Sequence, residues 1–581
     1  MKKHSLIKRI AVASKKEQAD IVVKNGKIVN VFTHEIIEED IAIVDGVIAG
    51  IGKYEGKITI DANGKYICPG LIDGHVHIES AMVRPSEFAK VVVPHGVTTV
   101  ITDPHEIANV AGIDGIQFML DDSEHVPLDV YVMIPSCVPS TPFEHAGAAL
   151  TAKDLEPLFS HPRVIGLAEV MDYPALLQGD SHIIDKLVTT FRYTNRVDGH
   201  AAGLNVDAIN VYTSAQIKTD HECVNAEEAL DRVRRGMYVL LRQGTVAKDL
   251  ERLIPAVNPQ TSRRFLFCTD DKHVDDLLSE GSIDYNVRLA IQNGIDPVTA
   301  IQMATINAAQ CYQLHTKGAI APGYDADFLL LDDLETMNIT HVYKAGVLVA
   351  ENGAYVLNQQ NKVTKIDEKL FHSMNAPKIT ADDIQIHFTK GRTAHVIQVI
   401  PNNLHTKHII ENVDVENGVF VPSIEKDVLK LIVVERHKRL GHIGVGIVKG
   451  FGIKCGAIAS SVAHDSHNII AVGTNDADLA AAANYLNEIG GGLVIVKNGI
   501  VLASLPLEIG GLMSSSGYQT VYKQLKELNK ALSDIGASQQ FNPFVTLAFL
   551  ALPVIPELKI TDKGLFDVKV FQHISVEAAE K

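Results

Sequence analysis

Short apolar runs separated by turn residues mark both ends of a long central region. Residues 21–66 contain IVVKNGKIVNV, IAIVDGVIAGIG and ITIDANGKYI, and the pattern returns at residues 327–356 in DFLLLDD and HVYKAGVLVAENGAYV. Asn-Gly or Asp-Gly between two such runs is typical of a β-hairpin. We therefore predict hairpins in both segments and expect them to form one small split β domain, made of residues 1–66 and 315–370.

Between these segments, apolar strands alternate with helix-length stretches such as 221–236 and 286–314. The candidate strands are GLIDGHVH, VTTVITD, VYVMIPS, VIGLAEV, RVDGHAA, AQIKTDHE, MYVLLRQ and FLFCTD. Eight such units favour an α/β fold, a (β/α)8 barrel over residues 67–314 with its functional residues at the carboxyl ends of the strands. The alternative, an open doubly wound sheet, predicts a Gly-rich phosphate turn after its first strand, and GHVHIES is not one.

A third, glycine-rich region covers residues 371–581. It contains GHIGVGIVKGFGIKCGAIASSVAHDSHN and a hairpin-like stretch, GGLVIVKNGIVLASLPL. The glycines of GVGIVKGFG do not have the dinucleotide-binding spacing, so we assign them to turns and close packing. We expect a separate C-terminal α+β domain.

Composition narrows the class of protein. The length of 581 residues suits two or three domains, and a net charge of −17 disfavours binding to nucleic acid or an anionic membrane. No window holds 18 uninterrupted apolar residues, and basic residues interrupt the start of the chain, so we expect neither a membrane span nor a signal peptide. The 6 cysteines are far apart without Cys-x-x-Cys, which predicts reduced thiols and a cytoplasmic protein.

Two histidines stand one residue apart at the end of the first central strand, in PGLIDGHVHIES. Residues i and i+2 of a strand point to the same face, so His75 and His77 face one point. An isolated His-x-His is more often a pair of surface histidines. Two neutral imidazoles facing one point are also what a divalent transition metal binds.

Other metal-competent residues follow later strands at spacings of whole βα units. Glu169 ends the fourth strand, His200 the fifth, His221 the sixth and Asp270 the eighth. A single Asp or His at a strand end is usually a cap or a solvated side chain. Together with the histidine pair, these residues predict a metal centre at one end of the barrel.

The ligand set is larger than one tetrahedral ion needs. Two ions roughly 3.5–4 Å apart, sharing a carboxylate and a hydroxide, use all six groups. Glu169, in the middle of the strand order, is the predicted bridge. Asp270 is predicted to bind one ion and to take or relay the proton of the attacking water. Mixed imidazole and carboxylate ligands suit Zn²⁺, Fe²⁺ and Mn²⁺.

The segment TDPHEIAN closes the second strand at the same end. Asp103, Pro104 and Glu106 have the spacing of an N-cap, a first-turn proline and a capping-box glutamate. Capping does not explain His105. We therefore keep His105 and Glu106 as candidates for proton transfer or substrate contact.

Four further features complete the candidates. Glu222, beside His221, is expected to orient a metal-bound imidazole, and Asp271 is expected to hydrogen-bond a neighbour. Arg84 is expected at the surface. A polar group in the third region is interpreted as a polar loop, a second metal site or a lid over the pocket: His464, Asp465, His467 and Asn468.

These motifs resemble a known family. PGLIDGHVHIES, the later histidines, the Thr-Asp at Asp270 and the return segment GAIAPGYDADFLLLD resemble the amidohydrolase superfamily. Within it, SAMVRPSEFAKVVVPHGVTTVITDPHEIANV, GLAEVMDYP and SSVAHDSHNI closely resemble bacterial adenine deaminases. Many superfamily members bridge their metals with a carbamylated lysine on strand four. VIGLAEV has no lysine, and Glu169 fills that place, which favours the deaminase over a cyclic amidase.

The resemblance implies hydrolytic deamination of adenine to hypoxanthine and ammonia at two Mn²⁺ or Fe²⁺ ions, by a hydroxide that bridges them, in a homodimer. The candidate catalytic residues remain Asp270, Glu169, His105 and Glu106. The implied metal ligands are His75, His77, Glu169, His200, His221 and Asp270. The candidate purine contacts are Glu106, Glu222 and Asp271.

Two alternatives stay open at this point. The first is another hydrolase of the superfamily, acting on a different aminopurine or on a cyclic amide. The second is a barrel that holds the metals but serves as a binding or regulatory protein. Release of ammonia separates the first alternative from the deaminase, and turnover separates the second.

Overall fold

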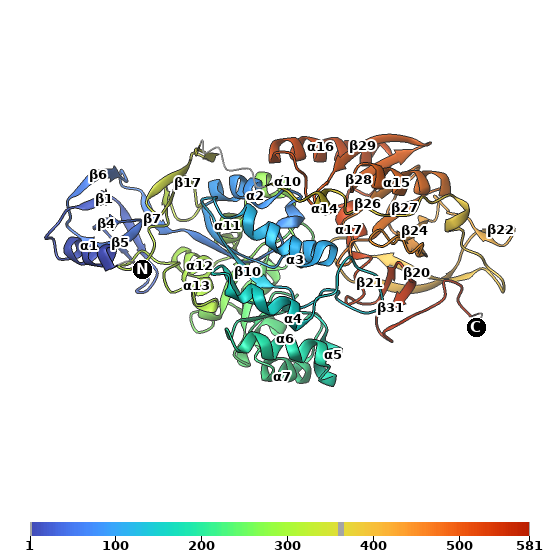
Figure 1. Ribbon diagram of the computed structural model, residues 1–581, viewed down its shortest axis with the longest axis horizontal. Helices are drawn as coiled ribbons and strands as arrows, with labels where there is room; N and C mark the ends of the chain where they lie inside the picture. The colour runs from blue at the N-terminus through green and yellow to red at the C-terminus, as the bar shows by residue number, and fades with distance from the viewer. Residues whose placement is uncertain (1–2, 358–364, 580–581) are drawn as a thin grey trace.

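The computed structural model describes residues 3–357 and 365–579. Three parts follow one another along its long axis: β-sheets near the N-terminus, a central set of parallel strands with helices around it, and a C-terminal sheet with its own helices (Figure 1). Residues 358–364, within the range predicted for the small β domain, lie outside the described residues, as do residues 1–2 and 580–581.

Two sheets form the N-terminal part of the molecule, and their first strand follows helix α1 (Lys3–Ala13) along the chain. The first has the spatial order β5 (Val47–Gly52), β4 (Asp40–Val44), β1 (Ala19–Lys24), β6 (Gly56–Asp61). The second has the order β19 (Ala354–Tyr355), β18 (Val347–Glu351), β17 (Ile339–Lys344), β16 (Phe328–Leu331), β7 (Tyr66–Pro69), β2 (Lys27–Asn30), β3 (Glu35–Ile37). Because β16 pairs with β7, strands from either side of the central region share one sheet.

The predicted hairpins have two outcomes. Asp45-Gly46 joins the antiparallel pair β4–β5, with φ of 49° and 74°, as a hairpin turn requires. The hairpins predicted at Asn25-Gly26 and Asn63-Gly64 are wrong, because β1 and β2, and likewise β6 and β7, lie in different sheets. The turn residues supply the left-handed backbone in each case, but the apolar side chains that each strand buries decide which strand it pairs with.

The eight predicted central strands are all present and run parallel to their sheet neighbours. One sheet contains β8 (Leu71–Val76), β9 (Val97–Thr102), β10 (Asp129–Ile134), β11 (Val164–Val170) and β12 (Val197–Gly199). The other contains β13 (Thr219–Asp220), β14 (Tyr238–Arg242) and β15 (Phe265–Cys268). The sheets curl, so that β8 contacts β15 and β12 contacts β13. Every residue of β8, β9, β11 and β15 is buried, as expected for strands covered on both faces.

Helices connect these strands and pack around them (Figure 1). They are α2 (Pro85–Val92), α3 (His105–Asp122), α4 (Ala152–Leu155), α5 (Tyr173–Gln178), α6 (Ser181–Phe191), α7 (Val206–Ser214), α8 (Ala226–Arg234), α9 (Leu250–Leu253), α10 (Val274–Ser279), α11 (Ile283–Gln292), α12 (Pro297–Ala304) and α13 (Ile306–Cys311). Several begin at a side-chain N-cap, such as Asn205 before α7 and Asn225 before α8, whose oxygens accept from a backbone N–H three residues on.

The C-terminal part is built on an eight-stranded sheet. Its spatial order is β21 (Thr406–Asn412), β20 (Thr393–Val399), β25 (Ile443–Lys449), β24 (Val428–Val434), β27 (Ile469–Gly473), β26 (Ala457–Ser460), β28 (Gly492–Lys497), β29 (Ile500–Pro506). Smaller strands are β22 (Val415–Glu416), β23 (Val419–Phe420), β30 (Leu558–Thr561), β31 (Gly564–Asp567) and β32 (Gln572–His573). Its helices are α14 (Glu368–Phe371), α15 (Asp476–Glu488), α16 (Tyr518–Asp534) and α17 (Pro543–Phe549).

Two sequence predictions for this part are confirmed. GGLVIVKNGIVLASLPL forms the antiparallel hairpin β28–β29 around Asn498-Gly499. The glycines of GVGIVKGFG serve close packing, since a Cβ on Gly444 would lie 1.9 Å from the Thr561 carbonyl oxygen.

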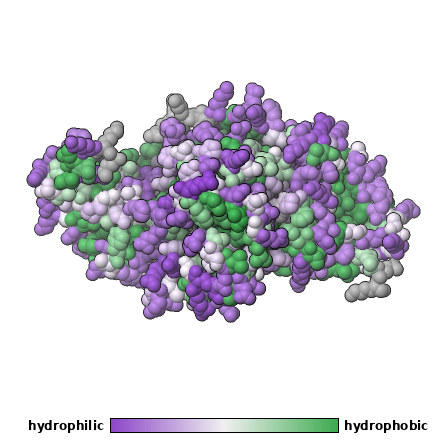
Figure 2. Space-filling model, turned by 60° about the horizontal axis from the view of Figure 1, so that its bottom comes forward, coloured by the Kyte–Doolittle hydropathy of each residue, from purple (hydrophilic) through white to green (hydrophobic). Residues whose placement is uncertain are grey.

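In the described ranges, no helix combines the length and the apolar character that crossing a membrane requires. The face drawn in Figure 2 is a mosaic of hydrophilic and hydrophobic side chains. Buried apolar clusters lie beneath the surface, such as the one that includes Leu167, Val197 and Tyr212.

Tyr212 ties the ends of two central strands together. Its hydroxyl donates to the Val170 carbonyl at the end of β11 and accepts from the His200 backbone N–H, 2.8 Å away, just after β12. These two strand ends carry Glu169 and His200. The tyrosine on α7 therefore fixes how the two side chains are presented.

We expect Tyr212→Phe to lower stability by about 1–3 kcal/mol, because a buried carbonyl and a buried N–H each lose their partner. Urea-induced unfolding of the purified protein measures this. Tyr193→Phe is the matched control, since that ring is 53% exposed and its hydroxyl bonds only a surface glutamate. Equal midpoints for the two variants would contradict the role given to Tyr212.

Candidate metal centre

All six predicted metal ligands meet at the carboxyl ends of the central strands. His75 lies in β8 and Glu169 in β11, while the other four follow β8, β12, β13 and β15 within two residues. The backbone holds Asp270 against the first of these segments: its N–H donates to the His75 carbonyl (3.0 Å) and its carbonyl accepts from the His77 N–H (3.4 Å). Strands distant in sequence thus present their polar side chains to one another.

Glu169 lies between two pairs of histidines. Its Oε1 is 3.5 Å from His77 Nε2 and 3.9 Å from His75 Nε2. Its Oε2 is 2.8 Å from His200 Nδ1 and 3.2 Å from His221 Nε2. One carboxylate oxygen therefore faces each pair, which is the arrangement of a carboxylate that bridges two cations.

Asp270 belongs to the first histidine pair. Its Oδ1 is 3.1 Å from His77 Nε2 and 3.6 Å from His75 Nε2. Its Oδ2 accepts a hydrogen bond from Arg242 Nη1 at 2.9 Å. Oδ1 of Asp270 thus faces the histidine pair, while Oδ2 is held by the Arg242 guanidinium.

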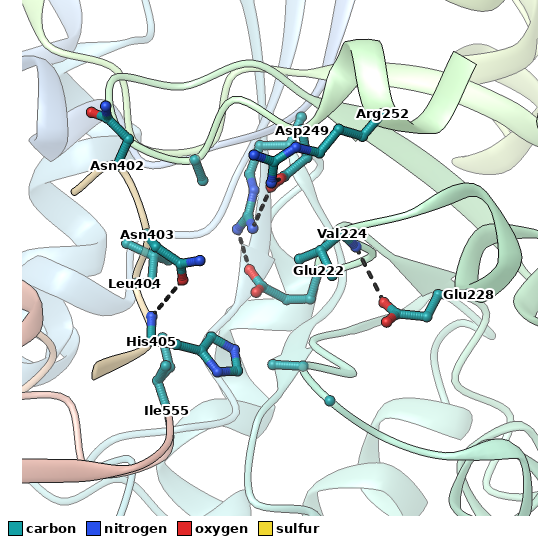
Figure 3. Close-up of a pocket in the computed structure, with 14 residues that line it drawn as sticks. Glu222, Val224, Glu228, Asp249, Arg252, Asn402, Asn403, Leu404, His405 and Ile555 are labelled. Carbon is teal, nitrogen blue, oxygen red and sulfur yellow. Dashed lines mark hydrogen bonds and ion pairs between the residues drawn. The ribbon is translucent and has the colours of Figure 1, made fainter. Parts of the chain in front are cut away.

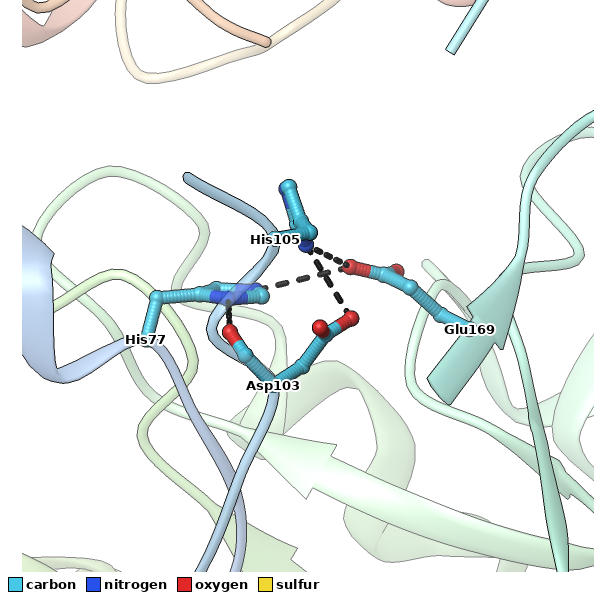
Figure 4. A group of neighbouring side chains, drawn as sticks. All are labelled: His77, Asp103, His105 and Glu169. Atoms are coloured by element: carbon cyan, nitrogen blue, oxygen red, sulfur yellow. Dashed lines mark hydrogen bonds and ion pairs between the residues drawn. The ribbon is translucent and has the colours of Figure 1, made fainter. Parts of the chain in front are cut away.

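The donor atoms fit divalent cations. His77 Nδ1 is 2.9 Å from the Asp103 carbonyl oxygen, which only accepts, so Nδ1 carries the proton and Nε2 of the neutral ring presents a lone pair to the centre (Figure 4). His75 Nε2 lies 3.1 Å from His77 Nε2. Buried groups that suit a metal include His75, His77 and Asp270, and also His75, Glu169 and His221.

Charges within the centre oppose the effect of burial. Burial alone lowers the pKa of His221, but the neighbouring Glu169 carboxylate outweighs it and raises the pKa to about 9. Burial alone raises the pKa of Glu169, whereas hydrogen bonds from His200 and His221 hold it well below its usual value. A cation that binds here displaces protons from imidazoles, so its affinity rises with pH.

The capping interpretation of Asp103 is wrong. The N-cap of α3 is Pro104, with no side-chain cap, and the Ile107 N–H in its first turn donates to Glu79 Oε1 at 3.2 Å. Asp103 is free for another role: its Oδ2 is 3.0 Å from His105 Nδ1, which is also 3.5 Å from Glu169 Oε1 (Figure 4). Asp103 therefore orients His105 toward the centre, and sequence reasoning missed this.

Glu106 is engaged by the C-terminal part. Its Oε1 is 2.7 Å from His464 Nδ1, and its Oε2 contacts His467 Nε2. The Ala463 N–H donates to His467 Nδ1 (3.1 Å), so the proton of the neutral ring is on Nε2 and points to Glu106. His464 also stacks on Phe549, with ring centroids 4.2 Å apart. Two residues of the polar segment, His464 and Asp465, thus line the chamber of the candidate metal centre.

Glu222 and Asp271 each bond a neighbouring side chain. Glu222 pairs with Arg242, and its Oε1 is 3.5 Å from His221 Nε2. Asp271 accepts from the Ser80 hydroxyl, which confirms the expected hydrogen bond to a neighbour.

The surface position predicted for Arg84 is wrong. Its side chain is buried and paired with Asp122, at the end of α3. The Asp122 carboxylate also accepts from the Ser86 N–H (2.9 Å) at the start of α2, so the packing of these two helices supplies an internal partner.

Arg242 is a residue that sequence reasoning missed. It ends β14, is buried, and donates to both Glu222 and Asp270, while its Nη2 is 3.5 Å from Asp249 Oδ2. The sequence pattern that could have indicated it is an arginine that closes an apolar strand, in MYVLLRQ. Its position is the carboxyl end of the strand, where the predicted ligands also lie.

Two adjoining cavities lead to the centre. The inner chamber, about 20 Å³, is lined by the metal-site residues and has room for about one water. The outer cavity, about 310 Å³, is large enough for a small ligand. They share four lining residues: Glu222, Arg242, Leu404 and Ile555.

The outer cavity lies between the central and C-terminal parts. Figure 3 shows Glu222, Glu228 and Asp249 facing the segment Asn402–His405 and Ile555. Buried Lys559 fastens this C-terminal wall by donating to the Leu404 and Phe549 carbonyl oxygens (2.8 and 3.0 Å).

Comparison with known proteins gives consistent matches. The Amidohydrolase family model matches residues 66–349, and the Adenine deaminase C-terminal domain model matches residues 403–572. The chain is 63% identical to the adenine deaminase of Geobacillus kaustophilus (strain HTA426) over 574 residues, 99% of each chain. It is 53% identical to that of Bacillus subtilis (strain 168), covering 99% of this chain and 100% of the other. A solved β-aspartyl dipeptidase from Fervidobacterium islandicum AW-1 is 18% identical, with a TM-score of 0.46, over 59% of this chain and 100% of that one.

We expect His77→Ala to lose bound metal and activity together while the chain stays folded. The substitution removes one of the two imidazole donors, His75 and His77, of the first histidine pair. Metal content by mass spectrometry and circular dichroism measure the two effects. His125→Ala, at a side chain that is 60% exposed, is the control. Full metal occupancy in His77→Ala would rule out the assignment.

We expect Arg242→Lys to lower kcat about 10- to 100-fold with metal retained, because an ammonium cannot donate to Glu222 and Asp270 as the planar guanidinium does. Steady-state kinetics and metal content are measured on the same preparation. Arg252→Lys, at a side chain 67% exposed in the wall of the outer cavity, should stay within about twofold. Similar losses in both variants would show that Arg242 has no special role.

Proposed function

The chain belongs to the adenine deaminase family of amidohydrolases, and we propose that it hydrolyses adenine to hypoxanthine and ammonia. The observation that carries the hydrolytic chemistry is Glu169, with one oxygen toward each histidine pair. The choice of adenine rests on relatives of that name, which match both the central and the C-terminal parts of the chain.

The proposed cofactor is a pair of divalent cations, Mn²⁺ or Fe²⁺, with Zn²⁺ also suited to the donors. His75, His77 and Asp270 would hold one cation, His200 and His221 the other, and Glu169 both. Bound cations make hydroxide available from water near neutral pH. The absence of lysine from β11, VIGLAEV, is consistent with a carboxylate bridge.

The protein side chains then have defined tasks. Water adds its oxygen to C6 of the purine, one of its two protons ends on N1 and the other on N6, the C6–N6 bond breaks, and N6 leaves as ammonia. We assign to Asp270 the proton of the attacking water, because Oδ1 faces the centre while Arg242 holds Oδ2. Glu222, paired with Arg242 in the wall of both cavities, is the proposed purine contact there.

We further infer that the central strands close into a (β/α)8 barrel. Two observations support closure: Val76 and Asp270 form a parallel bridge that joins the first and last strands, and β12 contacts β13. In a closed barrel the functional residues occupy the carboxyl ends of the strands, as the six candidate ligands do here.

We expect the protein purified with added Mn²⁺ to release ammonia from adenine with about two metals bound per chain. Chelation should remove the activity, and Mn²⁺ should restore it. Coupled ammonia assay, chromatography of hypoxanthine and metal analysis are run on one sample. Two metals without ammonia would retain the centre but refute adenine as the substrate.

A further inference from the structure

Asp465, from the C-terminal part, lines the inner chamber and has an unpaired carboxylate oxygen. Among the described residues, three lining side chains have a buried polar atom without a hydrogen-bond partner: His200 Nε2, Arg242 Nε and Asp465 Oδ2. Of these three atoms, only Asp465 Oδ2 is a carboxylate oxygen. Asp465 is 2% exposed, so no bulk water reaches this oxygen. A buried acceptor without a donor is costly and marks a position where a ligand's donor fits.

No donor of the described residues bonds Asp465 Oδ2. The other oxygen, Oδ1, lies 3.7 Å from His105 Nε2, which is too long for a hydrogen bond. His105 Nε2 also lies 3.3 Å from Glu106 Oε1, on the other side. The Asp465 carboxylate therefore stands beside the catalytic candidate His105 without being bound by it.

The backbone around Asp465 is held firmly. His464 and His467 are fixed by Glu106, as described above. Ser466 donates to Glu144 Oε2 (2.7 Å), and Asn468 donates to the His145 carbonyl (2.8 Å). Neighbours on both sides of Asp465 are thus bonded to the central part, so the carboxylate is held in place for recognition.

Adenine has one N–H group that matches this acceptor. Its amino group and N1 belong to the reacting end, which must face the candidate metal ligands. The remaining N–H is on the five-membered ring, at N9 or N7. A carboxylate that accepts this hydrogen makes a charge-assisted bond. A nucleoside or a 9-alkyl purine has no such N–H and would leave the carboxylate unpaired.

Apolar side chains of the C-terminal part complete the chamber. Phe549, Leu552, Leu404 and Ile555 line it, and the last two also border the outer cavity. Such surfaces suit the faces of a flat heterocycle. Because the chamber alone has room for about one water, a purine also needs space from the adjoining cavity across this wall.

We propose that Asp465 is the residue that restricts the enzyme to free purine bases, by accepting the hydrogen bond of the imidazole-ring N–H. The C-terminal domain then determines specificity while the barrel residues carry the reaction. This inference rests on the proposed function, since the orientation of the base follows from attack at C6.

The test compares adenine with 9-methyladenine in wild type and in Asp465→Asn. Wild type should prefer adenine by at least about tenfold in kcat/KM. Asp465→Asn should lose about 10- to 100-fold on adenine and much less on 9-methyladenine, because only adenine loses a charge-assisted bond. Asp382→Asn, an exposed aspartate of the same part of the chain, is the control. Metal content and thermal unfolding show whether each variant is intact.

Equal losses on both substrates would overturn the proposal, because they are the result expected if Asp465 only positions His105. Equal turnover of adenine and 9-methyladenine by wild type would overturn it even if the variant failed to fold. Calorimetric binding of hypoxanthine and 9-methylhypoxanthine gives a readout without turnover, and it should show the same preference for the unsubstituted base.

The binding measurement also separates this inference from the proposed function. Wild type that holds two metals and releases no ammonia from adenine refutes the function. If that protein still prefers the unsubstituted base and Asp465→Asn removes the preference, the recognition by Asp465 stands. If neither hypoxanthine nor 9-methylhypoxanthine binds, the proposed function and the recognition by Asp465 are both refuted.

Discussion

The structure depends on one carboxylate that is shared between two histidine pairs. Glu169 is buried, and each of its oxygens faces imidazole nitrogens from different strands. A buried carboxylate is tolerated only when charges or donors surround it. Here the neighbouring imidazoles provide this stabilisation, and bound cations would strengthen it. The curl of the central sheets brings the strand ends that carry these side chains to one point.

Support for this centre comes from outside it. Arg242 holds Asp270, Asp103 orients His105, and the Tyr212 hydroxyl joins the ends of β11 and β12. None of these three contacts requires the C-terminal part, yet Glu106 is bonded to two histidines of it. The candidate centre is therefore built by the central strands and covered by residues of the C-terminal part.

Sequence reasoning located the residues at strand ends because parallel strands and a fixed polarity constrain where their carboxyl ends lie. All eight central strands and the meeting of six polar side chains follow from that rule. It did not find Arg242, since one arginine after an apolar strand is common. It misjudged Asp103 because the capping pattern is a local spacing, whereas in the fold the Asp103 carboxylate bonds the His105 ring instead of a backbone N–H of α3. It misplaced the Asn25-Gly26 and Asn63-Gly64 hairpins because turn chemistry does not specify pairing.

The sheet that joins β7 to β16 has a consequence for synthesis on the ribosome. Tyr66–Pro69 emerges early, but its antiparallel neighbour Phe328–Leu331 follows the whole central region. At ~5–20 residues per second, the roughly 260 intervening residues take about 13–50 s to appear. During that interval one edge of the nascent sheet has open backbone hydrogen-bonding groups. A chaperone or the ribosome surface that shields this edge would protect the newborn chain from aggregation until its own later strand arrives.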